Sequence, residues 1–350
     1  MTLYERLADL PLVVEDCGFD LREAETSSGF TRTTTVVTLA GDGVRGHGED
    51  VTYESESHYA LVDAPPDFGL AGEWTFEEFA ARLDGVDLFP NHPPEQALAR
   101  NYRRFAVESA ALDLALRQAD TDLASALDRS YDPLHFVAST RLGEPPSPER
   151  VHALRDIVPG LEFKLDPTSA WTPELVSDLA ATGAVRIVDL KGQYEGTEVD
   201  QPADRDLYEL VIESFPEAIV EDPELTAETH PLVERHADRL SWDYPITGPE
   251  SIDAQGLRPA WVNVKPSRFG AVEDLLATVE RCERAGIGLY GGGQFELGVG
   301  RDHVQAFASA LYPEAPNDVA PRAFNRPSPP PDLPASPLAP PERPRGLGWS

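Results

Sequence analysis

The second half of the sequence alternates short apolar runs with segments whose apolar residues recur at helical spacing. Helical segments lie between the runs at about 172–182, 203–214, 227–237, 271–285 and 299–311. The runs themselves read HFVAS, LEFKLD, VRIVDLKG, AIVEDP, RLSWDYP, WVNVKP and GIGLYGGG. Strands that alternate with helices predict parallel pairing with crossover connections. Because no Gly-rich GxGxxG turn follows the first run, seven such units favour a closed (β/α) barrel over an open doubly wound sheet.

The first 130 residues follow a different pattern. Residues 30–39 are rich in Thr and Val, and the GDG sequence that follows predicts an antiparallel hairpin. From 95 to 127 the apolar residues recur at helical spacing, and AVESAALDLAL is apolar nearly all round. We therefore predict an α+β domain over residues 1–130, a barrel over 131–325, and a Pro-rich tail over 326–350 that is disordered.

Composition limits the classes of partner. The formal charge is −32, from 61 acidic and 29 basic residues, and such a surface repels nucleic acid and anionic membranes. The acidity, with few lysines, resembles proteins of salt-adapted cytoplasm of the haloarchaeal type. Cys17 and Cys282 lie far apart, and no run of 18 apolar residues occurs. We expect a cytoplasmic protein that binds neither membranes nor nucleic acid.

Lysine is rare, and its placement is informative. The three lysines, Lys164, Lys191 and Lys265, each stand at the end of an apolar run. Arginine keeps its proton in proteins, whereas lysine can be tuned into a general acid or base. For any one of these lysines alone, a structural cation is the simpler interpretation.

Five consecutive predicted strands each end in a charged residue. In chain order these are Lys164, Asp189, Glu221, Asp243 and Lys265, separated by 25, 32, 22 and 22 residues. In an alternating barrel the C-terminal ends of the strands meet on one face. Three carboxylates that converge there need a cation, and Mg²⁺ is the natural choice for oxygen ligands. Strand-end acids also serve as helix N-caps or loop residues, but three in succession between rare lysines favour a metal site.

These residues, together with GGGQFELGVGRDH and AVESAALDLAL, resemble the enolase superfamily, and the lysine of VNVKP resembles the muconate lactonizing enzyme subgroup. The resemblance implies an α/β fold, with an α+β capping domain over a modified (β/α)7β barrel of the TIM type. It also implies Mg²⁺ held by Asp189, Glu221 and Asp243, with Lys164 and Lys265 as acid and base. The implied reaction abstracts a proton α to a carboxylate through an enediolate. It leads to racemisation or epimerisation, cycloisomerisation, or syn-dehydration of the o-succinylbenzoate synthase type.

The motifs depart from the subgroup at three strand ends. The second strand of the subgroup carries Lys-x-Lys, and here the sequence is Glu162-Phe163-Lys164. Pairing the motif with Lys164-Leu165-Asp166 would instead lose the catalytic lysine, and we prefer the first alignment for its spacing to Asp189. Asp189-Leu190-Lys191 replaces Asp-x-Asn, and Asp243-Tyr244 replaces Asp-Glu.

Four further residues are candidates for substrate binding: Lys191, Gln294, Glu296 and Arg32. Lys191 would bind a carboxylate, or else is a solvated loop cation. Gln294 and Glu296 would line the mouth of the barrel, although Glu296 also suits a helix N-terminus. Arg32, in a predicted lid over residues 27–32, would clamp a distal carboxylate or is an ordinary surface arginine.

The expected partner is a small carboxylate substrate, with a homo-oligomer possible. An acid-sugar dehydratase is the alternative enzyme, but the seventh predicted strand lacks the His of the mandelate racemase type, and His303 lies in the following helix. A noncatalytic relative that binds metal or carboxylate is the other alternative.

Overall fold

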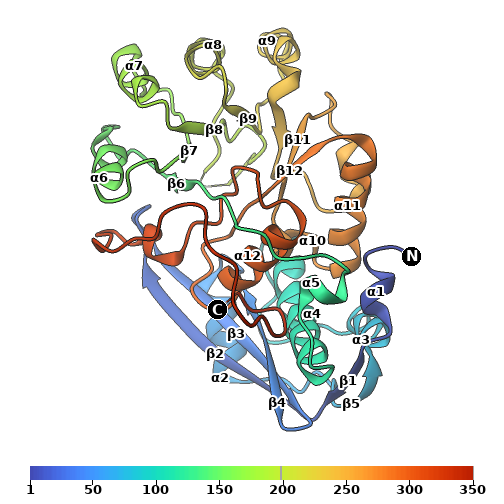
Figure 1. Ribbon diagram of the computed structural model, residues 1–350. Helices are drawn as coiled ribbons and strands as arrows, with labels where there is room; N and C mark the ends of the chain where they lie inside the picture. Colours follow the sequence, from blue (N-terminus) through green and yellow to red (C-terminus); the bar gives the residue numbers. More distant parts are fainter. Residues whose placement is uncertain (198, 350) are drawn as a thin grey trace.

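The computed structural model describes residues 1–197 and 199–349. It has an N-terminal cap and a C-terminal barrel, as predicted (Figure 1). The cap centres on an antiparallel sheet of three strands in the order β2 (Asp16–Glu25), β3 (Thr31–Gly41) and β4 (Val44–Asp50). β3 and β4 form the expected hairpin around the GDG sequence, with Gly41 opposite Val44.

The long helix α4 (Ala99–Gln118) packs against β4. Two glycines allow this close approach, because a Cβ at Gly46 would lie 2.3 Å from the carbonyl oxygen of Ala110, and one at Gly48 only 1.9 Å from that of Ala106. The remaining cap elements are α1 (Glu5–Ala8), β1 (Pro11–Val14), α2 (Ser55–Asp63), β5 (Gly72–Thr75), α3 (Phe76–Leu83) and α5 (Leu123–Ala126).

The barrel contains seven parallel strands that pair in chain order. They are β6 (Ala138–Thr140), β7 (Phe163–Leu165), β8 (Val185–Asp189), β9 (Ile219–Glu221), β10 (Leu240–Trp242), β11 (Trp261–Val264) and β12 (Gly288–Gly291). The ring closes through residues 317 and 318, because Asn317 pairs with Phe136 before β6 and Asp318 pairs with Gly292 after β12. The fold is therefore a (β/α)7β barrel, as the sequence indicated.

Helices cover the outside of the barrel. In Figure 1, α6 to α9 fan out on the side away from the cap, whereas α10 and α12 lie toward it. Their bounds are α6 (Glu149–Ile157), α7 (Pro173–Ala181), α8 (Arg205–Ser214), α9 (His230–Arg235), α10 (Pro266–Phe269), α11 (Val272–Ala285) and α12 (Gly300–Leu311). Among the described residues, none of the helices has the length and apolar character needed to cross a bilayer.

A buried carboxylate ties the cap to the barrel. Glu49 of β4 is 3% exposed and accepts hydrogen bonds from the backbone N–H groups of Leu297, Gly298 and Gly300. These groups lie at the N-terminus of α12, where a helix has unpaired N–H groups and favours negative charge. The carboxylate therefore fixes the cap sheet against the end of a barrel helix.

The tail differs from the expectation of disorder. Residues 326–349 contain no α-helix or strand, as their prolines dictate, but they lie against the body. Leu338 pairs with Leu134, and the N–H of Leu347 donates to Asp113 Oδ1 at 2.7 Å. Leu347 is fully buried, and Trp349 packs edge-on against Tyr131. The sequence pattern correctly excluded regular structure, but the docking depends on a few apolar side chains that composition does not reveal.

We expect Leu347→Ala to lower the free energy of unfolding by about 2–5 kcal/mol, because it removes a fully buried leucine and leaves a cavity. Urea denaturation at high salt measures the change. The exposed neighbour Glu342 provides a control, since Glu342→Ala should change the stability by less than about 0.5 kcal/mol. Equal stabilities for the two variants would show that the tail is not docked.

Candidate metal centre

Three carboxylates converge at one end of the barrel. Asp189 and Glu221 are the last residues of β8 and β9 and pair with each other, and Asp243 directly follows β10. All three are fully buried, and one oxygen from each lies within 4.8 Å of the others. The structure therefore brings together the three residues that the sequence placed at consecutive strand ends.

The electrostatics of this triad depend on cations. Burial and the neighbouring Asp189 raise the pKa of Glu221 well above its usual range. Burial alone would also raise the pKa of Asp189, but Lys164 and Lys191 lower it. Asp243 responds in the same way, because Arg268 and Lys265 overcome the effect of burial and hold its pKa well below normal. Three convergent, buried oxygen donors suit a hard divalent cation such as Mg²⁺.

Lys164 lies within the triad. Its Nζ contacts Glu221 Oε1 and lies 3.0 Å from Asp189 Oδ2 and 3.7 Å from Asp318 Oδ2. Its side chain is only 2% exposed. Burial favours a lower pKa for this amine, but the surrounding carboxylates, Asp189 foremost, raise it well above the usual value. Lys164 is thus a buried ammonium group that balances the triad.

Lys265 approaches the triad from β11. Its Nζ lies 2.8 Å from Asp243 Oδ2, and its side chain is 7% exposed. Burial lowers its pKa, and Arg268 adds to this effect while Asp243 opposes it. The two lysines that the sequence singled out as a pair therefore have opposite shifts of pKa.

Lys191 also belongs to the site. The backbone of Lys191 is in the left-handed region, with φ of 55°. The Nζ binds Asp189 Oδ2 and lies 3.9 Å from Asp166 Oδ2 and 4.8 Å from the centre of the Tyr194 ring. At 12% exposure, the side chain is not a solvated loop cation.

Five residues that sequence reasoning did not single out also contact the ligands. One is Asn263, whose Nδ2 donates to Glu221 Oε1 at 3.4 Å. Arg268 Nη1 lies 2.5 Å from Asp243 Oδ1, and the Tyr194 hydroxyl donates to Asp243 Oδ2 at 2.9 Å. The Tyr290 hydroxyl donates to Glu221 Oε2 at 2.6 Å. The carboxylate of Asp222 accepts the N–H groups of Asp243 and Tyr244, each at 2.8 Å. Arg268 and Asp222 were visible in KPSRFG and VEDP, next to expected site residues, whereas nothing in the sequence marked the two tyrosines.

Arg32 joins the cap to the barrel through buried hydrogen bonds. Its Nη1 donates to the carbonyl oxygen of Thr52 at 2.6 Å, and its Nη2 to that of Gln294 at 3.2 Å. The guanidinium also stacks 4.2 Å from the centre of the Tyr53 ring. Arg32 is 1% exposed, so it is not an ordinary surface arginine.

The other two candidates from the loop after β12 brace that loop. The Tyr53 hydroxyl donates to Gln294 Oε1 at 2.9 Å. Glu296 accepts the backbone N–H of Gln294 at 2.5 Å and pairs with Arg301 at 2.8 Å. Neither residue has a direct contact with the triad among the interactions of the described residues.

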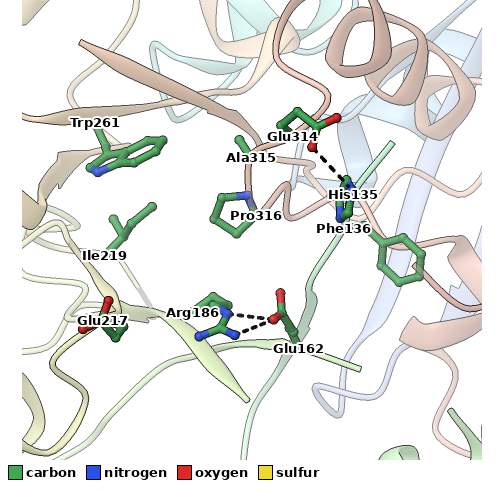
Figure 2. Close-up of a pocket in the computed structure, with 10 residues that line it drawn as sticks. All are labelled: His135, Phe136, Glu162, Arg186, Glu217, Ile219, Trp261, Glu314, Ala315 and Pro316. Carbon is green, nitrogen blue, oxygen red and sulfur yellow. Dashed lines mark hydrogen bonds and ion pairs between the residues drawn. The ribbon is translucent and has the colours of Figure 1, made fainter. Parts of the chain in front are cut away.

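Glu162 lies at the opposite end of the barrel. It pairs with Arg186 at 2.7 Å, and both residues line a cavity of about 260 Å³ near the starts of the strands (Figure 2). Glu162 therefore stands apart from Lys164 and does not take the place of a second lysine at the triad.

A larger cavity, of about 540 Å³, is lined by residues of both cap and barrel, including Tyr244, the residue after Asp243. Leu98 and Asn101 line it from the cap, and Tyr244 and Thr247 line it from the loop after β10. The amide of Asn101 donates to the carbonyl oxygen of Arg268 at 2.8 Å. Asn101, which lines the cavity, thus contacts Arg268, the arginine that pairs with Asp243.

The fold is shared with solved structures at low sequence identity. Muconate lactonizing enzyme from Pseudomonas putida is 21% identical, with a TM-score of 0.64 over 88% of each chain. Muconate lactonizing enzyme from Pseudomonas fluorescens, complexed with muconolactone, is 19% identical, with a TM-score of 0.65 over 88% of each chain. A member of the enolase superfamily from Listeria innocua is 16% identical, with a TM-score of 0.64 over 89% of this chain and 86% of that one.

No curated protein matches the sequence. Two family models do, and they divide the chain between them. The N-terminal domain of a domain of unknown function, DUF8230, matches residues 5–126, and the C-terminal domain of the same family matches residues 130–326. The protein therefore belongs to the DUF8230 family and has the fold of muconate lactonizing enzyme.

Proposed function

We propose that the protein is an isomerase or lyase that binds Mg²⁺ and abstracts a proton α to the carboxylate of a small carboxylic acid. The observation that carries this proposal is the buried triad of Asp189, Glu221 and Asp243, whose oxygens converge within 4.8 Å beside lysine side chains. The shared fold supports it, because the similar structures include muconate lactonizing enzymes and a member of the enolase superfamily.

Each group has a role that follows from its position. A divalent cation at the triad would neutralise the charge that builds on the substrate carboxylate as the α-proton leaves. Lys265, at the edge of the triad, is placed to carry a proton on the β11 side. On the opposite side, β7 brings Lys164 and Asp166 toward the ligands. Lys191 and Arg268 hold positive charge next to Asp189 and Asp243.

The intermediate on this route is an enediolate, and its fate sets the product. Return of the proton on the opposite face gives racemisation or epimerisation. Expulsion of a β-carboxylate oxygen opens a lactone ring, and the reverse of this step followed by α-protonation gives cycloisomerisation. Loss of a β-hydroxyl on the same face gives syn-dehydration. The cavity bordered by Tyr244 and Asn101 has room for the remainder of a small substrate.

One observation favours a second candidate, a noncatalytic carboxylate-binding protein. The ammonium groups of Lys164, Lys191 and Lys265 already contact all three carboxylates of the triad, and with Arg268 they balance its charge without a metal ion. Metal binding decides between the two candidates.

We expect the protein to bind Mg²⁺ with a stoichiometry of one, measured by isothermal titration calorimetry at high salt. Asp189→Asn and Glu221→Gln should each weaken binding roughly tenfold or more, because the ion loses a charged ligand. Asp206, whose side chain is 97% exposed, supplies the control, and Asp206→Asn should leave the affinity unchanged. Absence of binding in the wild type would favour the noncatalytic candidate.

A second prediction concerns Lys265. Incubation of the Mg²⁺-loaded protein with a panel of carboxylates in D₂O should place deuterium at the α-carbon of at least one of them, as detected by NMR. Lys265→Ala should slow this exchange by about 10²–10⁴-fold for the substrate face that the amine serves. Lys265→Arg should not restore it, since a guanidinium does not release its proton. Full activity in Lys265→Arg would contradict the role of the amine as a proton carrier.

A further inference from the structure

The β7 segment presents three charged side chains at alternate positions, Glu162, Lys164 and Asp166. Alternate residues of a strand point to the same side, so these three share the inner side of the barrel at successive heights. Glu162 borders the cavity at the N-terminal end, and Lys164 lies among the carboxylates of the triad. Asp166, just beyond the end of the strand, is the one nearest the mouth.

The register between β7 and β8 sets the position of Asp166 relative to the triad. Lys164 pairs with Ile187. The same register, extended by two residues, places Asp166 beside Asp189. Lys164 therefore lies one inward-facing layer below Asp166.

The register around the barrel then shows what faces Asp166. From Asp166, the line of paired residues crosses the next four strands at Asp189, Glu221, Ser241 and Trp261. Strands of such a barrel are tilted, with a shear of about eight residues over eight strands. Each residue in a series of strand-to-strand pairs therefore lies about one residue lower along the barrel axis than the residue before it. After four steps, Trp261 lies about four residues lower than Asp166. The residue at the height of Asp166 is therefore four positions after Trp261, which is Lys265. Four steps in a ring of eight are also half a turn, so Asp166 and Lys265 lie across the barrel from each other.

The surroundings of Asp166 suit a group that meets a substrate. Its side chain is 16% exposed, against 2% for Lys164. Its Oδ2 lies 3.7 Å from Arg141 Nε and 3.9 Å from Lys191 Nζ, and these cations balance its charge. Its Oδ1 is buried and has no hydrogen-bond partner. A buried carboxylate oxygen without a partner is costly, and a substrate group would satisfy it.

Lys164, by contrast, has its contacts filled. Its ammonium group reaches three carboxylates, those of Asp189, Glu221 and Asp318. By the same reasoning from register, it is level with Glu221, below the layer that holds Lys265. Its position is that of a countercharge beneath the ligands.

We propose that Asp166, and not Lys164, is the catalytic residue that carries the proton on the β7 side, opposite Lys265. This inference rests on the proposed function. In one direction the α C–H bond breaks, its proton forms an O–H bond on Asp166, and its electron pair enters the enediolate. The ammonium of Lys265 then donates a proton to the opposite face of the same carbon and becomes a neutral amine. Proton exchange with solvent water, or a turnover in the reverse direction, returns both groups to their starting states, so no oxidant or other reactant is needed.

The test follows α-proton exchange in D₂O for each enantiomer separately, because two opposed groups serve opposite faces. The probes are the two enantiomers of 2-phenylpropionate, N-acetylalanine and 2-hydroxybutyrate, with Mg²⁺ present. Wild type should exchange both enantiomers of a substrate. Asp166→Asn should slow the exchange of one enantiomer by about 10²–10⁴-fold and spare the other, and Lys265→Ala should show the reverse preference.

Two controls separate this role from a structural one. Asp166→Asn should keep the affinity for Mg²⁺ within about twofold, since Asp166 contacts none of the three ligands among the interactions described. Lys164→Met should change the affinity for Mg²⁺ while keeping any residual exchange equal for the two enantiomers. A selective loss of one enantiomer cannot arise from misfolding, which lowers both.

The outcomes are distinct. Unchanged exchange in Asp166→Asn, equal loss of both enantiomers, or exchange of only one enantiomer by the wild type overturns the assignment of Asp166 but leaves the proposed function standing. No exchange by the wild type with any probe, together with no binding of Mg²⁺, overturns the proposed function and the role of Asp166 with it.

Discussion

The structure is organised around three carboxylates that are taken out of water at one point. Asp189, Glu221 and Asp243 would repel one another strongly in a buried layer, so the fold must supply positive charge there. It does so from several elements at once, with lysines from β7, β11 and the loop after β8 and an arginine from α10. The ends of the barrel strands are therefore held by attraction between groups that none of the elements could bury alone.

The cap contributes to this arrangement by a similar use of charge. Glu49 inserts a carboxylate at the N-terminus of α12, and Arg32 reaches from β3 to the carbonyl oxygen of Gln294. Both contacts are buried and involve the loop that follows β12. The cap thus fixes the loop on the β12 side of the mouth.

Much of the fold could be predicted because its signals are local. The apolar runs and helical spacings located α7, α8, α11 and α12 within two residues at each end, and the GDG sequence located the hairpin of β3 and β4. The strand-end carboxylates were found because parallel strands deliver their C-terminal residues to one face. The helix α6 was missed, since it contains only a short stretch of weakly amphipathic sequence after a Pro-rich segment.

Other features depend on distances that no local pattern sets. Whether Lys164 or Asp166 faces a substrate is a matter of height in the barrel, which follows from the pairing of β7 with its neighbours. The preferred alignment of Glu162-Phe163-Lys164 with Lys-x-Lys relied on spacing along the chain, which does not reveal that Glu162 pairs with Arg186 at the N-terminal end of the strands. Tyr194 and Tyr290 reach the ligands from a loop and from β12, and only the closed ring brings their hydroxyl groups there.

The scarcity of lysine has a consequence for the surface of the molecule. All three lysines are committed to the site, with side-chain exposures of 2%, 12% and 7%. None of the three offers a freely exposed ε-amino group to solvent. Reagents and enzymes that modify exposed lysine side chains, by acylation, ubiquitin attachment or cross-linking, therefore find almost no lysine target on the described chain.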